Sequence, residues 1–249
     1  MITSMFCYKQ NQYGNMIKIA LRVISLGLLF SAPEGLNASE KLYVFYPSAT
    51  RPHIIFEKLQ NSMKDVRVFV FGNASDFLAR VSMEPPDAIL TKTAIIHQLN
   101  NYSIVFRGAR GENTEEGYVL VSIKSSNHSP AVDSESVVGI VDFLGRTGMI
   151  NFVREIFPVM PRIKRVNKPE DLIPLLIFEM ADFVLTEESK VEFLKTLTNR
   201  PLEVIPLTTG KQGIVALAVF KGKKGTAVIN GLKSLQSDTK QLFGIDKWK

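Results

Sequence analysis

The order of its hydrophobic segments constrains the fold of this chain more than any other feature. From residue 41 onward, short apolar runs alternate with amphipathic stretches, and the alternation restarts after a polar interruption. Apolar runs rich in β-branched and aromatic residues are typical of strands, whereas apolar residues at helical spacing are typical of helices. Strands that alternate with helices build largely parallel sheets. The sequence therefore predicts an α/β protein.

The first series of elements runs to residue 124. The pattern predicts strands over residues 41–46, 66–71, 87–90, 103–107 and 116–124, with helices over 51–63, 75–81 and 94–99. Residues 125–136 are polar and contain Asn127, Pro130 and Asp133, a composition that indicates a loop and a crossover between lobes. The alternation then restarts at Val137.

The second series predicts strands over residues 137–143, 162–166, 181–185 and 202–207, and helices over 149–157, 169–178 and 187–197. Residues 208–210 form a second candidate crossover. Residues 212–220 are apolar after Gln212, which predicts a central strand buried on both faces. The end of the chain, 226–248, is expected to form one amphipathic helix with a further turn.

Two crossovers imply a discontinuous first lobe. We expect residues 39–126 and 211–249 to form lobe 1 and residues 127–210 to form lobe 2, each a mixed sheet flanked by helices. A cleft between two such lobes suits a small ligand, because helix N-termini and the carboxyl ends of strands face it. We expect a monomer.

The N-terminal residues resemble an export signal. Lys18 and Arg22 precede an apolar run over residues 23–32, which is followed by small residues up to Ala38. This predicts a signal peptide over residues 1–38, with Met16 as a possible start, and places the protein in the periplasm. An uncleaved anchor helix is the alternative. The single cysteine, Cys7, precedes the cleavage site, so the exported chain would contain no disulfide, no thiol nucleophile and no lipid-bearing cysteine.

The charge balance favours small acidic ligands. The chain has a net charge of +6, of which residues 1–38 contribute +2 (three basic residues minus one acidic residue), leaving about +4. These charges are spread along the chain, with no basic stripe of the kind that binds nucleic acid.

Four strand-to-helix turns carry the candidate ligand-binding residues. Hydroxyl groups, backbone amides and nearby basic side chains at helix starts suit an oxyanion, and glycines allow close approach of a ligand. Tyr46 is the expected aromatic wall. The predicted contacts are Tyr46, Ser48, Thr50, Thr91, Lys92, Thr93, Gly145, Arg146, Thr147, Gly148, Thr186 and Glu187. The alternative is that the Ser and Thr residues serve only as helix caps.

Catalytic patterns are missing from the sequence. It contains no G-x-S-x-G, no P-loop and no H-E-x-x-H, and its three histidines are scattered, so we expect no metal and no cofactor. An enzyme on the same fold would have to use Asp142, Glu187 and His97, which no arrangement supports. A scaffold protein is a further alternative.

Several segments resemble the phosphonate and phosphite substrate-binding proteins of ABC transporters, which have the type II periplasmic binding fold. VGIVDFLGRTGM resembles the strand and phosphonate-binding turn of that family, with Thr147 and Gly148 in matching positions and Gly145 and Arg146 in place of Ser and Thr. YPSATRP, PDAILTKTA, EMADFVLTEES and the C-terminal VINGLKSLQSDTKQLFGIDKW resemble further family segments. The resemblance implies capture of a phosphonate-like or phosphate-like anion for an ABC permease, or a role as the sensing partner of a membrane signalling protein.

Overall fold

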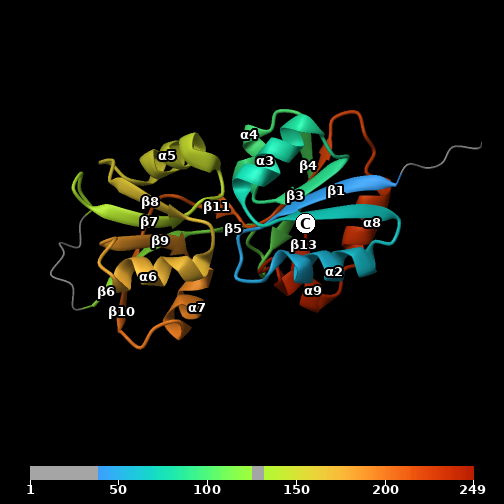
Figure 1. Cartoon of the computed structure of the whole chain (residues 1–249). Coiled ribbons are helices and arrows are strands. Elements are labelled where there is room, and N and C mark those ends of the chain that lie inside the picture. Colours follow the sequence, from blue (N-terminus) through green and yellow to red (C-terminus); the bar gives the residue numbers. More distant parts are fainter. Residues whose placement is uncertain (1–38, 125–131) are drawn as a thin grey trace, which may run out of the picture. The chain divides into compact units, whose positions relative to one another are not determined.

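A computed structural model describes residues 39–124 and 132–249, which form two α/β lobes (Figure 1). The predicted signal peptide and the tip of the polar segment, residues 125–131, lie outside the described residues. Within the described part of the chain, no helix is both long and apolar enough to cross a bilayer.

The sheet of the first lobe has the strand order β13-β4-β12-β3-β1-β2. Its strands are β1 (Glu40–Phe45), β2 (Val66–Phe71), β3 (Ala88–Thr91), β4 (Tyr102–Ala109), β12 (Ala216–Phe220) and β13 (Lys247–Trp248). Strand β1 is parallel to β2 and β3, while β12 is antiparallel to β3 and β4. The predicted central position of the 212–220 segment is confirmed for β12, whose residues from Ala216 to Val219 are buried.

Helices cover both faces of this sheet. One face packs α2 (Pro52–Ser62) and the C-terminal helices α8 (Thr226–Lys233) and α9 (Ser237–Gln241) against apolar strand residues such as Leu42 and Leu217. The other face packs α3 (Ala74–Met83) and α4 (Thr93–Gln98) against Tyr43, Phe45 and Ile89. Alternate residues of β1 therefore serve two different cores, as the two-residue period of a strand requires.

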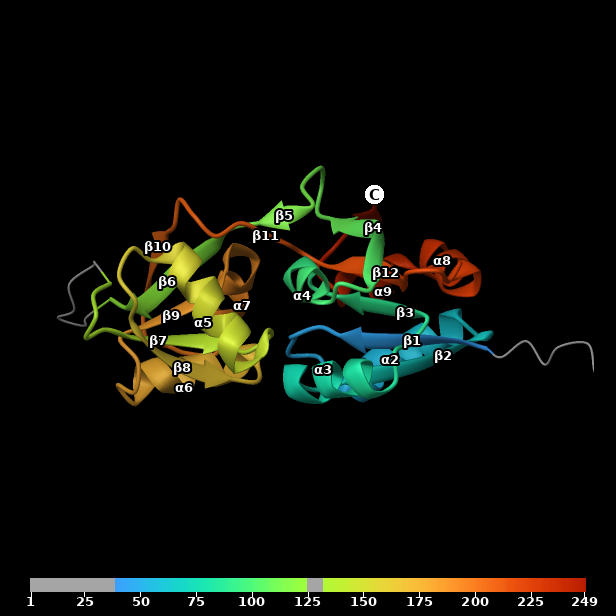
Figure 2. The same ribbon diagram turned by 90° about the horizontal axis from the view of Figure 1, so that it is seen from above.

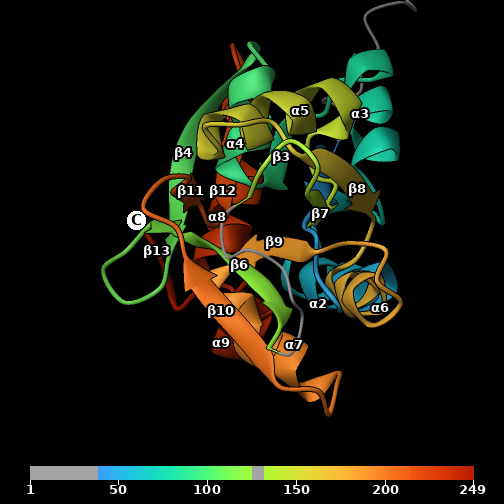
Figure 3. The same cartoon turned by 90° about the vertical axis from the view of Figure 1, so that its left-hand side faces the viewer.

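The second sheet has the order β10-β6-β9-β7-β8. Its strands are β6 (Tyr118–Ile123), β7 (Val137–Val141), β8 (Arg162–Val166), β9 (Phe183–Glu187) and β10 (Leu202–Pro206). Helix α5 (Gly145–Ile156) covers one face, and α6 (Leu172–Ile177) and α7 (Val191–Thr196) cover the other (Figure 3). Short 3₁₀ turns at Pro169–Asp171 and Glu188–Lys190 lead into α6 and α7.

Two short strands connect the lobes. Strand β5 (Glu115–Glu116) pairs antiparallel with β11 (Gln212–Gly213), and the pair lies between the two groups of elements (Figure 2). The chain passes from lobe 1 to lobe 2 through β5 and returns through β11. Both passages therefore run side by side, which is the arrangement of a hinge.

The predicted lobe boundary at residue 126 is wrong. Strand β6, which the sequence analysis assigned to lobe 1, lies between β10 and β9 in the second sheet. The first crossover is instead the segment between β4 and β6, residues 110–117. The polar segment at 125–136 joins β6 to β7 within lobe 2. Its composition indicates exposure to solvent, and exposure does not distinguish a loop inside one lobe from a passage between two lobes.

Two helix predictions are also corrected. The C-terminal segment is not one helix: α8 ends near Ser234, α9 follows, and the chain finishes as β13 on β4. Gly244 has a φ of +66°, a conformation that favours glycine and turns the chain after α9 towards β4. Helix α5 starts at Gly145, four residues earlier than predicted, because the backbone amide of Gly145 is capped by the Asp142 carboxylate at 2.8 Å.

Candidate functional site

The lobes meet through side chains at the carboxyl ends of β1 and β3 on one side and of β7 and β9 on the other. One apolar cluster includes residues from both lobes, with Phe45 and Ile95 on the lobe 1 side and Phe143 and Phe152 on the lobe 2 side. Charged groups are also buried here. We name Tyr46, Lys92, Glu116, Glu187 and Lys190 the interlobe cluster, because lobe 1, the hinge strand β5 and lobe 2 all contribute to it.

Lys92 is the most deeply buried charge of the interlobe cluster. Its side chain is 1% exposed, and its Nζ lies 2.8 Å from Glu187 Oε1 and 4.0 Å from Glu116 Oε1. The same Nζ lies 5.8 Å from the centre of the Tyr46 ring and 5.7 Å from that of Phe143. The ammonium of Lys92 is therefore held by carboxylates and aromatic faces from both lobes, which favour a cation electrostatically.

Glu116 connects this ammonium to the hinge. Its Oε2 accepts hydrogen bonds from Ser189 Oγ at 2.6 Å and from Arg110 Nη1 at 3.3 Å. Arg110 also donates to the carbonyl oxygen of Gly244. Among the described residues, Glu116 Oε1, Lys92 Nζ and Thr91 Oγ1 are buried without a hydrogen-bond partner. Lys92 and Glu187 form an ion pair at 2.8 Å. Buried polar atoms are normally satisfied, so these three identify a place where further polar contacts would be favourable.

Lys190 has a different environment from Lys92. Its Nζ lies 5.6 Å from the centre of the Tyr46 ring, and no carboxylate of the described residues lies within ion-pair distance of it. Burial lowers the pKa of Lys190 below its usual value, although Glu187 acts in the opposite direction. Lys190 is therefore a partly buried cation with no carboxylate of the described residues within ion-pair distance.

The remaining groups titrate as expected for a buried cluster. Burial alone would raise the pKa of Glu187, but the charges of Lys92 and Lys190 outweigh it and hold that pKa below its usual value. Burial, followed by the charges of Glu187 and Glu116, raises the pKa of Tyr46 and Tyr118 well above the usual value. Tyr118 donates a hydrogen bond to Glu187 Oε1 at 3.4 Å. Both tyrosines are therefore neutral, and both glutamates are surrounded by cationic or donor groups.

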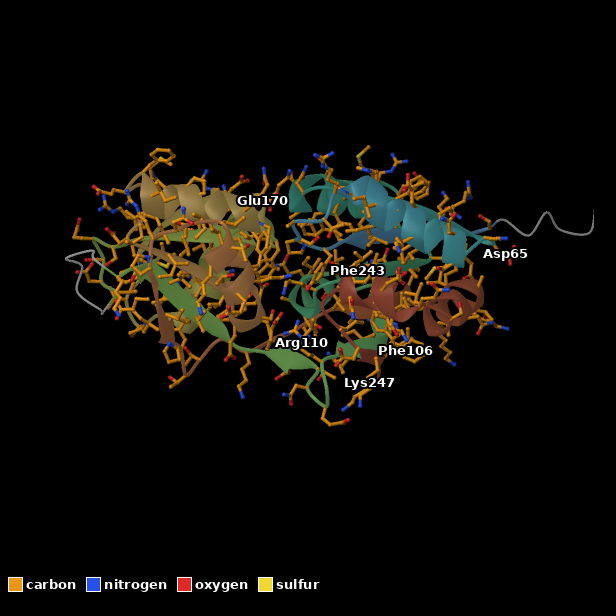
Figure 4. All side chains as sticks on the ribbon, turned by 90° about the horizontal axis from the view of Figure 1, so that it is seen from below. Asp65, Phe106, Arg110, Glu170, Phe243 and Lys247 are labelled. Atoms are coloured by element: carbon orange, nitrogen blue, oxygen red, sulfur yellow. The ribbon has the colours of Figure 1, made fainter. Side chains whose placement is uncertain are left out.

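A cavity of about 520 Å³ adjoins the cluster at the hinge. Arg110 and Thr114 to Gly117 line it from the connecting segment, Glu188 and Ser189 from lobe 2, and Lys211 and Ile214 from the returning segment. Figure 4 shows Arg110 beside the connecting strands. A volume of this size is in the usual range for small-molecule sites. Glu116 and its partner Ser189 line the cavity, so the cavity borders the interlobe cluster at Glu116.

The structure brings some of the predicted site residues together. Tyr46, Lys92 and Glu187 meet in the interlobe cluster, and Thr91 is buried beside Lys92. Thr186 is buried in β9, and Thr93 packs so closely on Gly213 that a Cβ there would lie 2.1 Å from Thr93 Oγ1.

The other predicted site residues lie in two turns. Ser48 and Thr50 form a local turn in which Ser48 Oγ accepts from the Thr50 amide at 3.0 Å. Arg146 and Thr147 are exposed in the first turn of α5. Gly145 has a φ of +71°, and Gly148 faces Gln98 of lobe 1, whose Nε2 lies 2.5 Å from where a Cβ would be. The glycine turn thus allows close packing between lobes.

Sequence reasoning missed four members of this environment: Arg110, Glu116, Tyr118 and Lys190. Glu116 carried a signal, since it stands two residues before the fully buried strand β6 and was expected inside a strand. Lys190 follows the predicted Thr186–Glu187 turn by three residues, so one helical turn places it beside Glu187. Of the catalytic candidates, Asp142 pairs with Arg165 at 2.5 Å and His97 is exposed. In residues 39–124 and 132–249, no group of His, Cys, Asp and Glu could hold a metal ion.

No protein-family model matches the chain, and no curated protein matches it in sequence. Solved structures do match. The periplasmic VFT2 domain of BvgS from Bordetella pertussis is 14% identical, with a TM-score of 0.53, over 82% of this chain and 92% of that one. ArtJ of Geobacillus stearothermophilus, an arginine-, lysine-, histidine-binding protein, is 16% identical, with a TM-score of 0.58, over 84% and 97%.

The substrate-binding protein of an amino acid ABC transporter is 12% identical, with a TM-score of 0.54, over 82% of this chain and 96% of that one. At these identities the likeness shows the fold: the chain has the two-lobed type II fold of periplasmic solute-binding proteins, as the sequence predicted. None of these three structures is described as a phosphonate-binding protein, so the narrower resemblance stays a prediction.

Proposed function

We propose that this protein is a periplasmic solute-binding protein that closes its two lobes over a small solute carrying an acidic group. The solute would lie in the interlobe cluster and enter from the adjoining cavity. The fold supports the general role, because its structural neighbours are solute-binding proteins and a periplasmic sensor domain. Fold alone does not set function, so the proposal depends on the site.

Lys190 is the observation that carries the proposal. A cation that is partly buried without an adjacent counter-ion is unfavourable, and the lowered pKa of Lys190 reflects the cost of its burial. An acidic group from a solute would pair with it. Around the cluster, Lys92, Lys190 and Arg110 stand against Glu116 and Glu187, three positive charges and two negative. The adjoining cavity is lined by two basic and four acidic side chains, so the acidic group of the solute is expected at Lys190 and not in the cavity. Carboxylate, phosphate and phosphonate groups all fit this chemistry.

The structural neighbours favour amino acids within this class. One is described as binding arginine, lysine and histidine, and another serves an amino acid ABC transporter. An amino acid carries a carboxylate that would suit Lys190. We propose an ABC permease as the partner of the loaded protein. A sensing role is the second candidate, and it is favoured by the likeness to a BvgS domain together with the ion pair that already joins the lobes.

A thermal-shift screen tests the proposal, because a solute that binds only the folded protein raises the melting temperature. The panel contains the twenty amino acids, methylphosphonate, phosphate and sulfate. We expect at least one acidic solute to give a saturable rise. Lys190→Met should abolish the rise, and Arg146→Ala, at an exposed position, should keep it. If no acidic solute raises the melting temperature, or if the rise survives in Lys190→Met, the proposal is wrong.

A further inference from the structure

The side chain of Lys92 ends in a site built for a cation. Around its Nζ lie the Glu187 carboxylate at 2.8 Å, the Glu116 carboxylate at 4.0 Å and two aromatic faces at 5.8 and 5.7 Å. Carboxylates combined with aromatic faces are the surroundings in which proteins recognise alkylammonium groups. These groups come from three separate parts of the chain, which meet only when the lobes are together.

Lys92 does not satisfy this site fully. Its Nζ lies 2.8 Å from Glu187 Oε1, whereas Glu116 Oε1, 4.0 Å from the same Nζ, is buried without a hydrogen-bond partner among the described residues. An ammonium has three hydrogens to donate, so this carboxylate oxygen can accept a further donor. A second ammonium, not tied to the chain between β3 and α4, could reach both carboxylates. The carboxylates of the site can therefore accept more hydrogen bonds from an ammonium than Lys92 donates.

We propose that the interlobe cluster is an ammonium-binding site that Lys92 fills as an internal ligand, and that an amine-bearing solute binds by displacing the Lys92 side chain. This inference rests on the proposed function, which places the solute in the interlobe cluster. It adds that the solute carries an amine besides its acidic group. An acidic group would pair with Lys190 while the ammonium takes the place beside Glu187. The solute would then be zwitterionic, and a simple anion would leave Glu116 and Glu187 without a new partner.

Displacement also gives Lys92 a role in specificity. The solute must bind Glu187 more favourably than Lys92 does, so weak or misplaced amines are rejected by competition. Freed from Glu187, the Lys92 ammonium lies near the acidic group of the solute and can pair with it. The ion pair of the protein is thereby exchanged for ion pairs between the solute and Glu187, Lys190 and Lys92.

Chemical rescue tests this inference directly. Lys92→Ala removes the occupant and leaves room for a small amine. We expect this variant to melt at a lower temperature than the wild type, and n-propylammonium to raise its melting temperature in a saturable way by roughly 5 °C. Neutral n-propanol should have no such effect, and n-propylammonium should not stabilise the wild type. Lys92→Ala combined with Glu187→Gln should lose the rescue.

A folded Lys92→Ala protein that n-propylammonium does not stabilise would overturn the inference. If that variant does not fold, reductive methylation of the wild type takes its place: Lys92 should react at least tenfold more slowly than the exposed Lys211. Equal reaction rates would also overturn the inference. The result is separable from the proposed function, because rescue requires no acidic solute. If n-propylammonium stabilises Lys92→Ala but no solute of the screen raises the melting temperature, the proposed function is wrong and the ammonium site stands.

Discussion

The ion pair between Lys92 and Glu187 makes a quantitative prediction about stability. Glu187→Gln keeps the shape of the side chain but leaves the Lys92 ammonium, 1% exposed, without its nearest carboxylate. Removing one partner of a buried pair costs about 3–5 kcal/mol, because the other charge stays desolvated. Glu116 at 4.0 Å supplies part of the missing attraction, so we expect about 3 kcal/mol.

Urea unfolding followed by circular dichroism measures this cost as a change in the free energy of unfolding. At about 2–4 °C per kcal/mol for a chain of this size, the melting temperature should fall by roughly 6–12 °C. Glu192→Gln is the matched control. Glu192 contacts Lys195 at 2.7 Å, but its side chain is 82% exposed, and such a pair contributes about 0.5 kcal/mol or less.

Replacing both charges together separates the effect of the pair from that of its surroundings. Lys92→Met with Glu187→Leu replaces both charges by apolar groups, which is often neutral or stabilising at buried positions. We therefore expect the double variant to be more stable than Glu187→Gln alone. A cost below about 1 kcal/mol for Glu187→Gln would mean that water reaches Lys92, and the description of a desolvated ion pair between the lobes would have to be abandoned.

Three further predictions concern the effect of pH, the hinge glycine Gly213 and the buried aromatic residue Phe143. The pKa of Glu187 lies below its usual value in the folded protein, so its stabilising effect is present above about pH 4.5 and is lost as the pH falls through the folded pKa. The cost of Glu187→Gln in urea unfolding should accordingly be smaller at pH 3 than at pH 7, and equal costs would refute the assignment. Gly213→Ala should destabilise by about 1–3 kcal/mol, because its Cβ would lie 2.1 Å from Thr93 Oγ1, whereas Gly72→Ala, with its closest contact at 3.5 Å, should have little effect in the same assay. Phe143→Ala should cost about 3–5 kcal/mol, since Phe143 is 2% exposed and stacks edge to face with Phe152; a cost near that of an exposed residue would place Phe143 outside the core.

The strands and most helices were readable from the sequence, because their burial follows a regular period. The run from Ala216 to Phe220 is apolar at each position, and only an inner strand covered on both faces accommodates that pattern. The passages between lobes were harder to predict. Strand β6 is buried at each of its positions as well, but nothing in its own residues indicates which sheet it joins. That choice depends on pairing with β9 and β10, which lie more than 60 residues further along the chain.

The residues of the candidate site, too, could be predicted only in part. Tyr46, Lys92 and Glu187 each stand at the end of a strand, and position alone predicted that they face the space between the lobes. Whether Lys92 meets a solute or a carboxylate of its own chain depends on the distance between the ends of β3 and β9, which no local pattern encodes. Glu116 and Lys190 escaped prediction for a related reason: each resembles a surface charge until the opposing lobe covers it. The site in such a fold therefore depends on contacts made across the hinge, and the buried lysine paired across it is the reason we propose that solute and protein compete for the same carboxylate.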